Sequence, residues 1–290
     1  MQRPSSVPAP VLVLGGVVSV QFGGALAATL VPEIGAAGSV TLRLIFATTI
    51  LLAVARPRLR GHRASAWRTV TAFGVALGLM NFAFYASLAH LPIGVAVTIE
   101  FIGPLTLATA LSRRPRDLLA VAAAALGVVL ISRALSVPLS HLDWTGLGLA
   151  AAAGACWAAY IILSGRTGAA FAQLDGLAIA MVVATALVLP FGLSSVPSWT
   201  PTAIAKGAGI ALLSSVLPYS LELLALRRMR AAVFGILLSS EPAVAALAGL
   251  LLLGQRLQPA QLLGMALVVA ASAMVLGRGG HQPDPAEAGG

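Results

Sequence analysis

Four ionisable side chains lie in stretches of this sequence that are otherwise apolar. Glu100 is the only charged residue between positions 92 and 112, and Glu241 is the only one between 231 and 254. Arg43 and Glu222 lie in two further apolar stretches. If these stretches span a membrane, each charge near the bilayer centre costs about 2.5 to 3.5 kcal/mol. Such side chains therefore face an internal cavity or one another, where they can bind a substrate or carry a proton.

Two interpretations of these four residues remain open. In the first, Arg43 pairs with one or two glutamates and only holds the helices together. In the second, one glutamate carries a proton and another group binds a substrate. Three acids against one base leave carboxylates unpaired, and burial away from water favours the neutral, protonated form of a carboxyl group. The working hypothesis is that Glu100 or Glu241 is the proton-coupling group, whereas Glu222 is expected nearer the cytoplasmic mouth.

The composition identifies the elements that position these residues. The chain has 290 residues, of which 59% are hydrophobic and only 9% are charged, and its mean hydropathy is +0.96. Soluble domains carry about 25% charged residues, so this is an integral membrane protein. The net charge of +9 comes from arginines in short gaps between apolar runs, a pattern that indicates membrane orientation and not nucleic-acid binding.

The apolar runs predict an all-α integral membrane protein with ten transmembrane helices. A spanning helix needs about 20 mostly apolar residues, and the predicted helices cover 10–32, 34–55, 69–90, 92–112, 117–133, 144–164, 174–195, 203–226, 231–253 and 261–277. Ala25-Leu26-Ala27 resembles a signal-peptidase site, but the first run is longer than a typical signal sequence, so we expect no cleavage.

The positive charges predict the orientation of the chain. With a cytoplasmic N-terminus, that side collects fourteen Arg residues, whereas the opposite side receives two Arg and one Lys. This positive-inside bias predicts a multi-pass protein of the inner membrane with both termini cytoplasmic. Residues 278–290 are expected to form a disordered cytoplasmic tail.

An internal repeat organises the predicted helices. With an offset of 137 positions, residues 81–85 align with 218–222, and Gly127 aligns with Gly264. The two halves, 10–133 and 144–277, each hold five predicted helices. An odd number of spans places the halves in opposite orientations, and such inverted repeats are typical of secondary transporters. We therefore predict two inverted five-helix repeats.

Prolines and aromatic residues accompany the embedded acids. A proline inside a helix has no N–H to donate to the carbonyl four residues earlier. Pro104, Pro218 and Pro242 should therefore free the carbonyls of Glu100, Ser214 and Leu238, in that order. Free carbonyls at membrane depth are tolerated where they line a cavity, although a simple packing kink is the alternative. Trp157 and Tyr160 share a helix face, either for packing or for cation–π contact with an ammonium group. Gly74 and Gly78 predict close helix packing.

Enzyme motifs are absent from the sequence. It contains no HExxH, no G-x-S-x-G and no G-x-x-x-x-G-K-[ST] phosphate loop, and its four histidines are scattered. We predict no catalytic residue, no metal site and no cofactor. A passive channel or a membrane scaffold remains an alternative to a coupled transporter.

These residues resemble the drug/metabolite transporter superfamily, and both halves resemble its EamA repeat. The similar strings span nearly the whole chain; they are Leu42-Arg43-Leu44, Met80-Asn81, Glu100-Phe101, Gly103-Pro104, Arg113-Arg114-Pro115, Ala155-Cys156-Trp157, Tyr160-Ile161, Leu217-Pro218-Tyr219-Ser220-Leu221-Glu222 and Glu241-Pro242-Ala243. Within the superfamily, the chain most resembles exporters of the RhtA type.

The resemblance implies proton-coupled export of small amino acids similar to threonine and homoserine. Transport of another metabolite or drug, or uptake, remains an alternative. For a zwitterionic substrate, Arg43 is predicted to bind the carboxylate, and Glu100 or Glu241 the ammonium group or the proton, with Glu222 as a further candidate. The predicted cavity lining is Asn81, Tyr85, Trp157, Tyr160 and Tyr219. The oligomeric state is not predicted.

Overall fold

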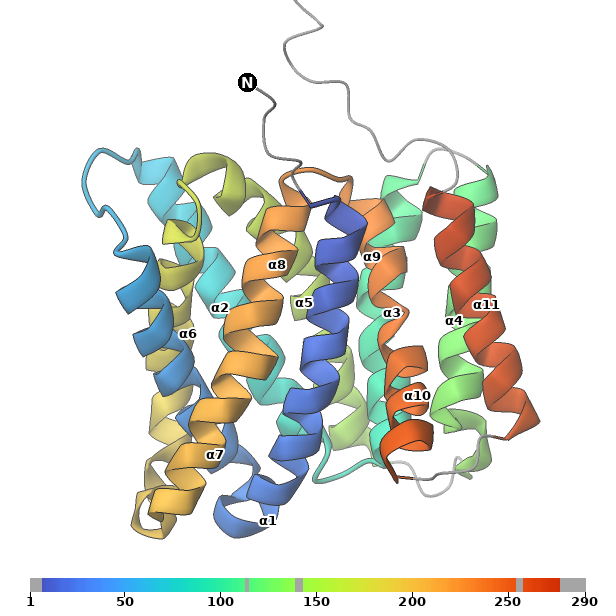
Figure 1. Cartoon of the computed structure of the whole chain (residues 1–290), viewed down its shortest axis with the longest axis horizontal. Helices are drawn as coiled ribbons and strands as arrows, with labels where there is room; N and C mark the ends of the chain where they lie inside the picture. The colour runs from blue at the N-terminus through green and yellow to red at the C-terminus, as the bar shows by residue number, and fades with distance from the viewer. Residues whose placement is uncertain (1–6, 113–114, 139–142, 254–257, 277–290) are drawn as a thin grey trace, which may run out of the picture.

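The computed structural model describes residues 7–112, 115–138, 143–253 and 258–276, and the predicted tail 278–290 lies outside them. Within these ranges all regular elements are helices packed side by side in one bundle (Figure 1). The α-helices are α1 (Ala9–Ala55), α2 (Ala64–Ser87), α3 (Ile93–Leu111), α4 (Pro115–Ser132), α5 (Trp144–Ala170), α6 (Asp175–Gly192), α7 (Pro201–Ala211), α8 (Leu217–Leu226), α9 (Ala231–Leu238), α10 (Glu241–Leu253) and α11 (Pro259–Leu276). Short turns of 3₁₀-helix, η1 (Ala134–Ser136) and η3 (Leu193–Ser198), follow α4 and α6, and a π-helical turn, η4 (Leu212–Val216), joins α7 to α8.

The described helices supply ten apolar segments, in agreement with the prediction. Six are long and apolar enough to cross a membrane, and four are shorter apolar helices. Most ends differ from the predicted ones by a few residues. The first two predicted helices form the two arms of α1, which folds back at Gly35, where φ is +76° (Figure 1). The all-helical membrane fold is thus confirmed for the described residues.

Two predicted helices are broken in the structure. The predicted helix 231–253 divides into α9 and α10 at a turn formed by Ser239 and Ser240. Pro242 follows this turn at the second position of α10, where its missing N–H breaks no helical bond. Glu241 therefore lies at the start of a half-helix inside the bundle, and not in the middle of a continuous one.

The predicted helix 203–226 is broken by the π-helical turn η4, just before Pro218. In this turn the N–H of Leu217 donates to the carbonyl of Leu212, five residues earlier. The Ser19 hydroxyl donates at 2.7 Å to the carbonyl of Leu213, the residue five positions before Pro218. The expected release of the Ser214 carbonyl by Pro218 assumed α-helical spacing, and it stays a prediction.

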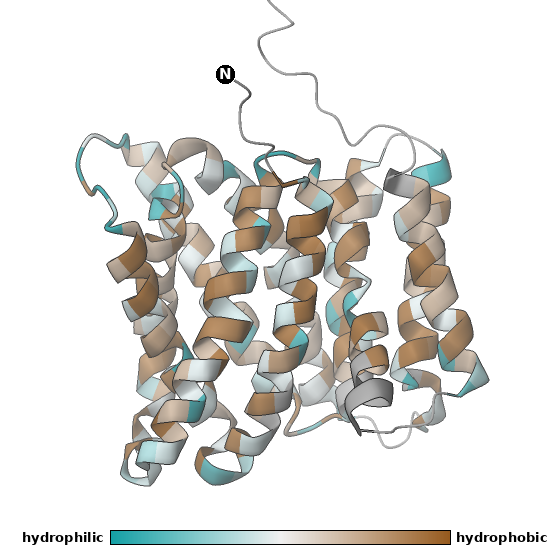
Figure 2. Ribbon diagram, in the orientation of Figure 1, coloured by the Kyte–Doolittle hydropathy of each residue, from teal (hydrophilic) through white to brown (hydrophobic). Residues whose placement is uncertain are grey.

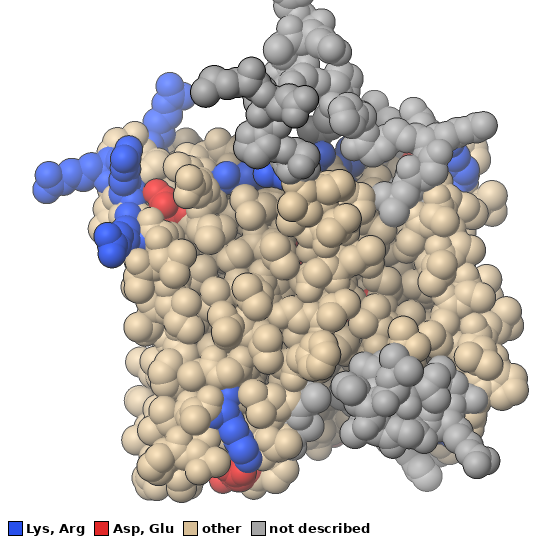
Figure 3. All heavy atoms as spheres, viewed as in Figure 1, with Lys and Arg blue, Asp and Glu red and all other residues tan. Residues whose placement is uncertain are grey.

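The two ends of the bundle differ in charge. In the ribbon coloured by hydropathy, brown apolar residues predominate along the helices, and teal polar residues gather mainly at the helix ends and in the loops (Figure 2). The end where α1 begins and α11 ends carries most of the visible Lys and Arg side chains (Figure 3). At the other end, the Lys206 ammonium donates to the Glu33 carboxylate and joins α7 to α1.

A hydrogen bond at that end joins the turn after α2 to the start of α5. His90 Nδ1 lies 2.6 Å from Asp143 Oδ2. Asp143 also caps α5, because its Oδ1 accepts the Thr145 N–H at 2.8 Å. The Thr145 N–H and then His90 hold the pKa of Asp143 below its usual value, so this capping group remains an anion at neutral pH.

Small residues let neighbouring helices approach closely. A Cβ atom at Gly74 would lie 2.5 Å from the Ala180 carbonyl oxygen, and one at Gly78 would lie 3.2 Å from the Ala184 Cα. The predicted role of this GxxxG pair in close packing is therefore confirmed, and its partner is α6.

Two contacts join residues that are 137 positions apart. The hydroxyls of Thr48 and Thr185 lie 2.7 Å apart, where α1 crosses α6. At the opposite flank, a Cβ at Gly127 would lie 2.7 Å from the Gly264 carbonyl oxygen, and a Cβ at Gly264 would lie 2.8 Å from that of Gly127. The inverted repeat stays a prediction, and these reciprocal contacts agree with it.

Candidate functional site

Arg43 lies on the second arm of α1 and is only 5% exposed. Its Nη2 donates to the Asn81 side-chain oxygen, and its guanidinium carbon lies 5.4 Å from the centre of the Tyr85 ring. Its Nε has no hydrogen-bond partner, and no salt bridge involves Arg43 among the described residues. The first interpretation, in which Arg43 pairs with a glutamate, therefore finds no support. Arg43 is a buried cation whose partners are neutral.

Asn81 connects this cation to the second half of the chain. It is buried on α2, and its side-chain nitrogen donates to the Leu77 carbonyl at 2.8 Å and to the Tyr219 hydroxyl at 3.2 Å. Because its amide oxygen accepts from Arg43, Asn81 fixes the guanidinium relative to α8. Three of the predicted lining residues, Asn81, Tyr85 and Tyr219, thus surround Arg43.

Glu222 and Tyr160 form a second buried cluster. The Tyr160 hydroxyl donates to Glu222 Oε2 at 2.7 Å, and Glu222 is only 5% exposed. The Tyr160 and Tyr219 rings lie 5.7 Å apart, so aromatic contact joins this cluster to the Arg43 cluster. The position of Glu222 near a helix end suggested an open mouth, but its side chain is enclosed. The burial arises because α5 supplies a tyrosine directly opposite it.

Glu100 and Glu241 are both half-buried, on α3 and at the first residue of α10. Neither makes a hydrogen bond or salt bridge with another described residue. Glu241 interacts electrostatically with both Glu222 and Glu100, so the three acids share one region of the bundle. A start-of-helix position suits Glu241, because the helix dipole favours a negative charge there. These two carboxyl groups are free to meet a cation or a proton.

The backbones of α3 and α5 touch beside Glu100. A Cβ at Gly154 would lie 2.6 Å from the Glu100 carbonyl oxygen, the group that Pro104 leaves without its helical donor. A Cβ at Gly103 would lie 1.8 Å from the Gly154 carbonyl oxygen. Helix α3 runs unbroken through Pro104, and α5 packs over the Glu100 carbonyl that lacks its helical donor. The crossing also fixes the depth of Glu100 relative to α5.

Trp157 lies one turn further along α5. Its ring meets the Phe101 ring edge-on at 4.8 Å, a contact that favours the packing interpretation of this residue over cation binding. Sequence reasoning named Phe101 only within a string that resembles the family and gave it no role. It missed Ser215, which lies in the π-helical turn and whose fully buried hydroxyl has no partner among the described residues. No periodicity in the sequence marks that turn.

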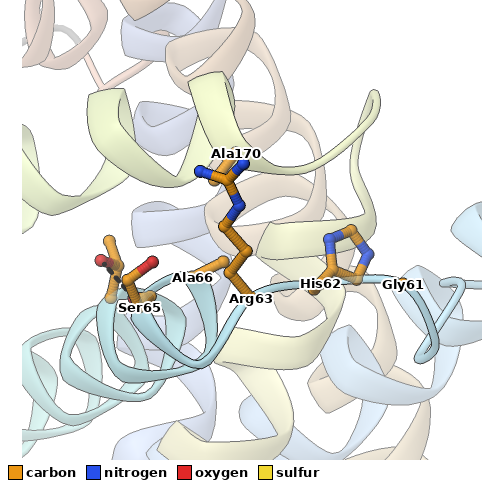
Figure 4. Close-up of a pocket in the computed structure, with 7 residues that line it drawn as sticks. Gly61, His62, Arg63, Ser65, Ala66 and Ala170 are labelled. Carbon is orange, nitrogen blue, oxygen red and sulfur yellow. Dashed lines mark hydrogen bonds between the residues drawn. The ribbon is translucent and has the colours of Figure 1, made fainter.

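An open surface pocket lies away from these clusters, at the basic end of the bundle (Figure 4). Its volume is about 350 Å³, and it lies where α2 begins and α5 ends. The described residues include no group of three or more His, Cys, Asp or Glu arranged to hold a metal ion.

Comparison with known proteins gives consistent matches. A model of the EamA-like transporter family matches residues 144–277. The chain is 42% identical over 265 residues to the threonine/homoserine exporter RhtA of Escherichia coli (strain K12), which covers 90% of this chain and 89% of that protein. It is 40% identical over 267 residues to the protein of the same name from Salmonella typhimurium (strain LT2), with 91% and 90% covered. A solved crystal structure shares the fold, with a TM-score of 0.78 at 17% identity, over 92% of this chain and 96% of that one.

Proposed function

We propose, because this chain belongs to the EamA-like transporter family of the drug/metabolite transporter superfamily, that it is a secondary exporter of small amino acids similar to threonine and homoserine. Family membership makes the chain a membrane transporter and not an enzyme. The substrate proposal rests on the names of the RhtA relatives, and one observation within the molecule supports it. Arg43 is a buried cation that has no anionic partner among the described residues.

The surroundings of Arg43 suit the carboxylate of an amino acid. A buried charge is costly unless it is paired, and Asn81 and Tyr85 leave the positive charge of Arg43 unbalanced. Guanidinium groups bind carboxylates with two parallel hydrogen bonds, and the buried Nε, which has no partner among the described residues, is a donor that a carboxylate can use once the surrounding helices part. A substrate carboxylate at Arg43 would therefore balance a buried positive charge.

The unpaired acids suit the other end of a zwitterion. Glu100 and Glu241 are half-buried and without partners among the described residues, so one can meet the substrate ammonium group while the other carries the coupling proton. Glu222 is less suited to a direct substrate contact, because Tyr160 already occupies one of its oxygens. In this arrangement Glu241 has the additional support of the α10 dipole.

Uptake into inside-out vesicles tests the proposed function. We expect saturable accumulation of labelled threonine and homoserine, driven by an acidic vesicle interior and abolished by a protonophore. Accumulation above equilibrium separates a coupled transporter from a passive channel, and the direction of net movement separates an exporter from an uptake carrier. A protein that moves neither amino acid but transports another metabolite would contradict the substrate proposal.

Replacement of the unpaired acids tests proton coupling. Glutamine has the shape of a protonated glutamate but cannot release a proton, so Glu100→Gln or Glu241→Gln should remove the stimulation by a pH gradient. Whichever of the two variants loses this stimulation should still exchange labelled for unlabelled threonine without a gradient, because exchange requires no net proton movement. The measurement is uptake with and without an imposed gradient. Undiminished gradient-driven uptake in both variants would remove Glu100 and Glu241 from the coupling step.

We further propose that the halves 10–133 and 144–277 are inverted repeats that exchange conformations during transport. The reciprocal contacts between Thr48 and Thr185, and between Gly127 and Gly264, support this proposal, because equivalent residues meet only where they lie on a shared symmetry axis. The charged end of the bundle supports an inner-membrane protein whose termini are cytoplasmic, since α1 begins and α11 ends there (Figure 3).

A further inference from the structure

The pocket at the basic end is built by two segments that are far apart in the sequence. The loop before α2 and the first turn of α2 supply His62, Arg63, Ser65 and Thr69, and the end of α5 supplies Ala170. The Arg63 side chain extends towards Ala170, with Ser65 on one side of it and the His62 ring on the other (Figure 4). A volume of about 350 Å³ lies within the usual range of ligand pockets, which begins at roughly 300 Å³.

The shape of this pocket is held by contacts behind it. The His62 ring packs on the Phe171 ring, with centroids 4.3 Å apart, and His62 Nε2 lies 3.0 Å from the Arg58 carbonyl oxygen. The Arg58 N–H donates to Asp175 Oδ2 at 3.3 Å, and Arg227 Nη2 donates to the Phe171 carbonyl at 2.8 Å. The loop is therefore anchored to the turn between α5 and α6.

The pocket carries a positive charge that no neighbouring acid balances. Five exposed arginines lie on this loop and the start of α2, namely Arg56, Arg58, Arg60, Arg63 and Arg68. None of them makes a salt bridge within the described part of the chain. The acid in contact with the loop, Asp175, is buried and accepts a backbone N–H instead of a guanidinium. Membrane orientation alone requires positive charge at this end, but it does not require an anchored pocket.

Exposed apolar residues lie just before the pocket in the chain. Val54, in the last turn of α1, is 66% exposed, and Leu59, between two of the arginines, is 60% exposed. Basic pockets between transmembrane helices on the cytoplasmic side bind phospholipid head groups. We propose that this pocket binds the phosphate of an anionic phospholipid, with Arg63 and Ser65 at the phosphate and the acyl chains along the exposed apolar residues at the end of α1. The proposal is independent of the transported substrate.

Lipid retention by the purified full-length protein tests this site. The protein is placed in bilayers of phosphatidylcholine with one-fifth phosphatidylglycerol, and the bound lipid is measured by native mass spectrometry after extraction. We expect retained phosphatidylglycerol for the unmodified chain and about fivefold less for Arg63→Gln. Arg68→Gln is the matched control, because it removes an equal charge five residues further along the chain at a position that does not line the pocket, and it should change retention little. Arg63→Lys should restore part of the loss.

Other outcomes would overturn the site. Equal losses in Arg63→Gln and Arg68→Gln would show that retention follows diffuse charge and not the pocket. Unchanged retention in Arg63→Gln, or displacement of the lipid by millimolar inorganic phosphate, would also overturn it, the latter because free phosphate would then be the ligand. Melting temperature in phosphatidylcholine alone should be equal for all variants, so a lipid-specific loss is separated from misfolding.

Discussion

Replacing Arg43 with glutamine is expected to weaken the binding of zwitterionic amino acids strongly while leaving the empty protein as stable as before, or more stable. A charge-assisted hydrogen bond contributes about 1.5 to 3 kcal/mol, so losing the guanidinium should weaken substrate affinity by roughly 10- to 100-fold. Arg43 is a buried cation without an anionic partner in the described part of the chain, so removing it should not destabilise the bundle, because its desolvation cost is removed as well. Threonine affinity and the melting temperature of the purified protein measure the two effects.

The pair of measurements separates a binding role from a structural one. If Arg43 only held helices together, Arg43→Gln would lower the melting temperature along with transport. Arg43→Lys should recover part of the transport, because an ammonium keeps the charge but not the two-pronged geometry of the guanidinium. A primary amine without a carboxylate should bind the unmodified protein and Arg43→Gln equally. Full threonine affinity in Arg43→Gln would refute the assignment of the substrate carboxylate.

Of the substitutions that add one methyl group at the α3–α5 crossing, Gly103→Ala is expected to lower the stability of the protein most. The new Cβ would lie 1.8 Å from the carbonyl oxygen of Gly154 and 2.4 Å from its carbonyl carbon. Both atoms belong to the backbone, so no side-chain rotation relieves the clash and the two helices must separate. Overpacking typically costs about 1 to 3 kcal/mol, and more where backbone must move. The melting temperature should fall, and transport should fall with it because Glu100 moves.

Gly148→Ala is the matched control for this prediction. Gly148 lies on α5, as Gly154 does, but a Cβ there would meet no atom within 4 Å. This variant should keep both the melting temperature and the transport of the unmodified protein. If Gly103→Ala matched it in both measurements, the close approach of α3 and α5 would not govern the position of Glu100.

Much of the fold could be predicted because a lipid environment leaves few choices. Apolar runs of about 20 residues must form helices that satisfy their own backbone, so the ten segments follow from length and composition. The breaks follow from finer causes. At the π-helical turn, the Ser19 hydroxyl of the distant helix α1 donates to the Leu213 carbonyl, and the second break is a turn at Ser239 and Ser240. Neither feature is visible in a local sequence pattern.

The sequence was enough to predict which charged residues are embedded in the helices, but not which side chains they contact. Position within an apolar run identified Arg43, Glu100 and Glu241 as embedded charges. The partners of a side chain depend on how each helix is rotated about its axis, which the run length does not determine. Arg43 therefore meets an asparagine instead of a glutamate, and Glu222 meets Tyr160. The roles of these residues in substrate and proton binding stay predictions.

The contact between Thr48 and Thr185 has a consequence for any measurement of motion. Each hydroxyl also lies within hydrogen-bond distance of a carbonyl on the other helix, Thr48 of Met181 at 3.0 Å and Thr185 of Leu44 at 3.2 Å, and the two protons serve two of these three contacts at a time. If the two halves exchange conformations as proposed, the distance between two equivalent residues, 137 positions apart, is the same before and after the exchange. Any other distance between the halves takes the value that its symmetry-related distance had before. Spectroscopic labels at Thr48 and Thr185 should therefore report one constant distance in both orientations of the carrier, which serves as a fixed reference for the helices that move.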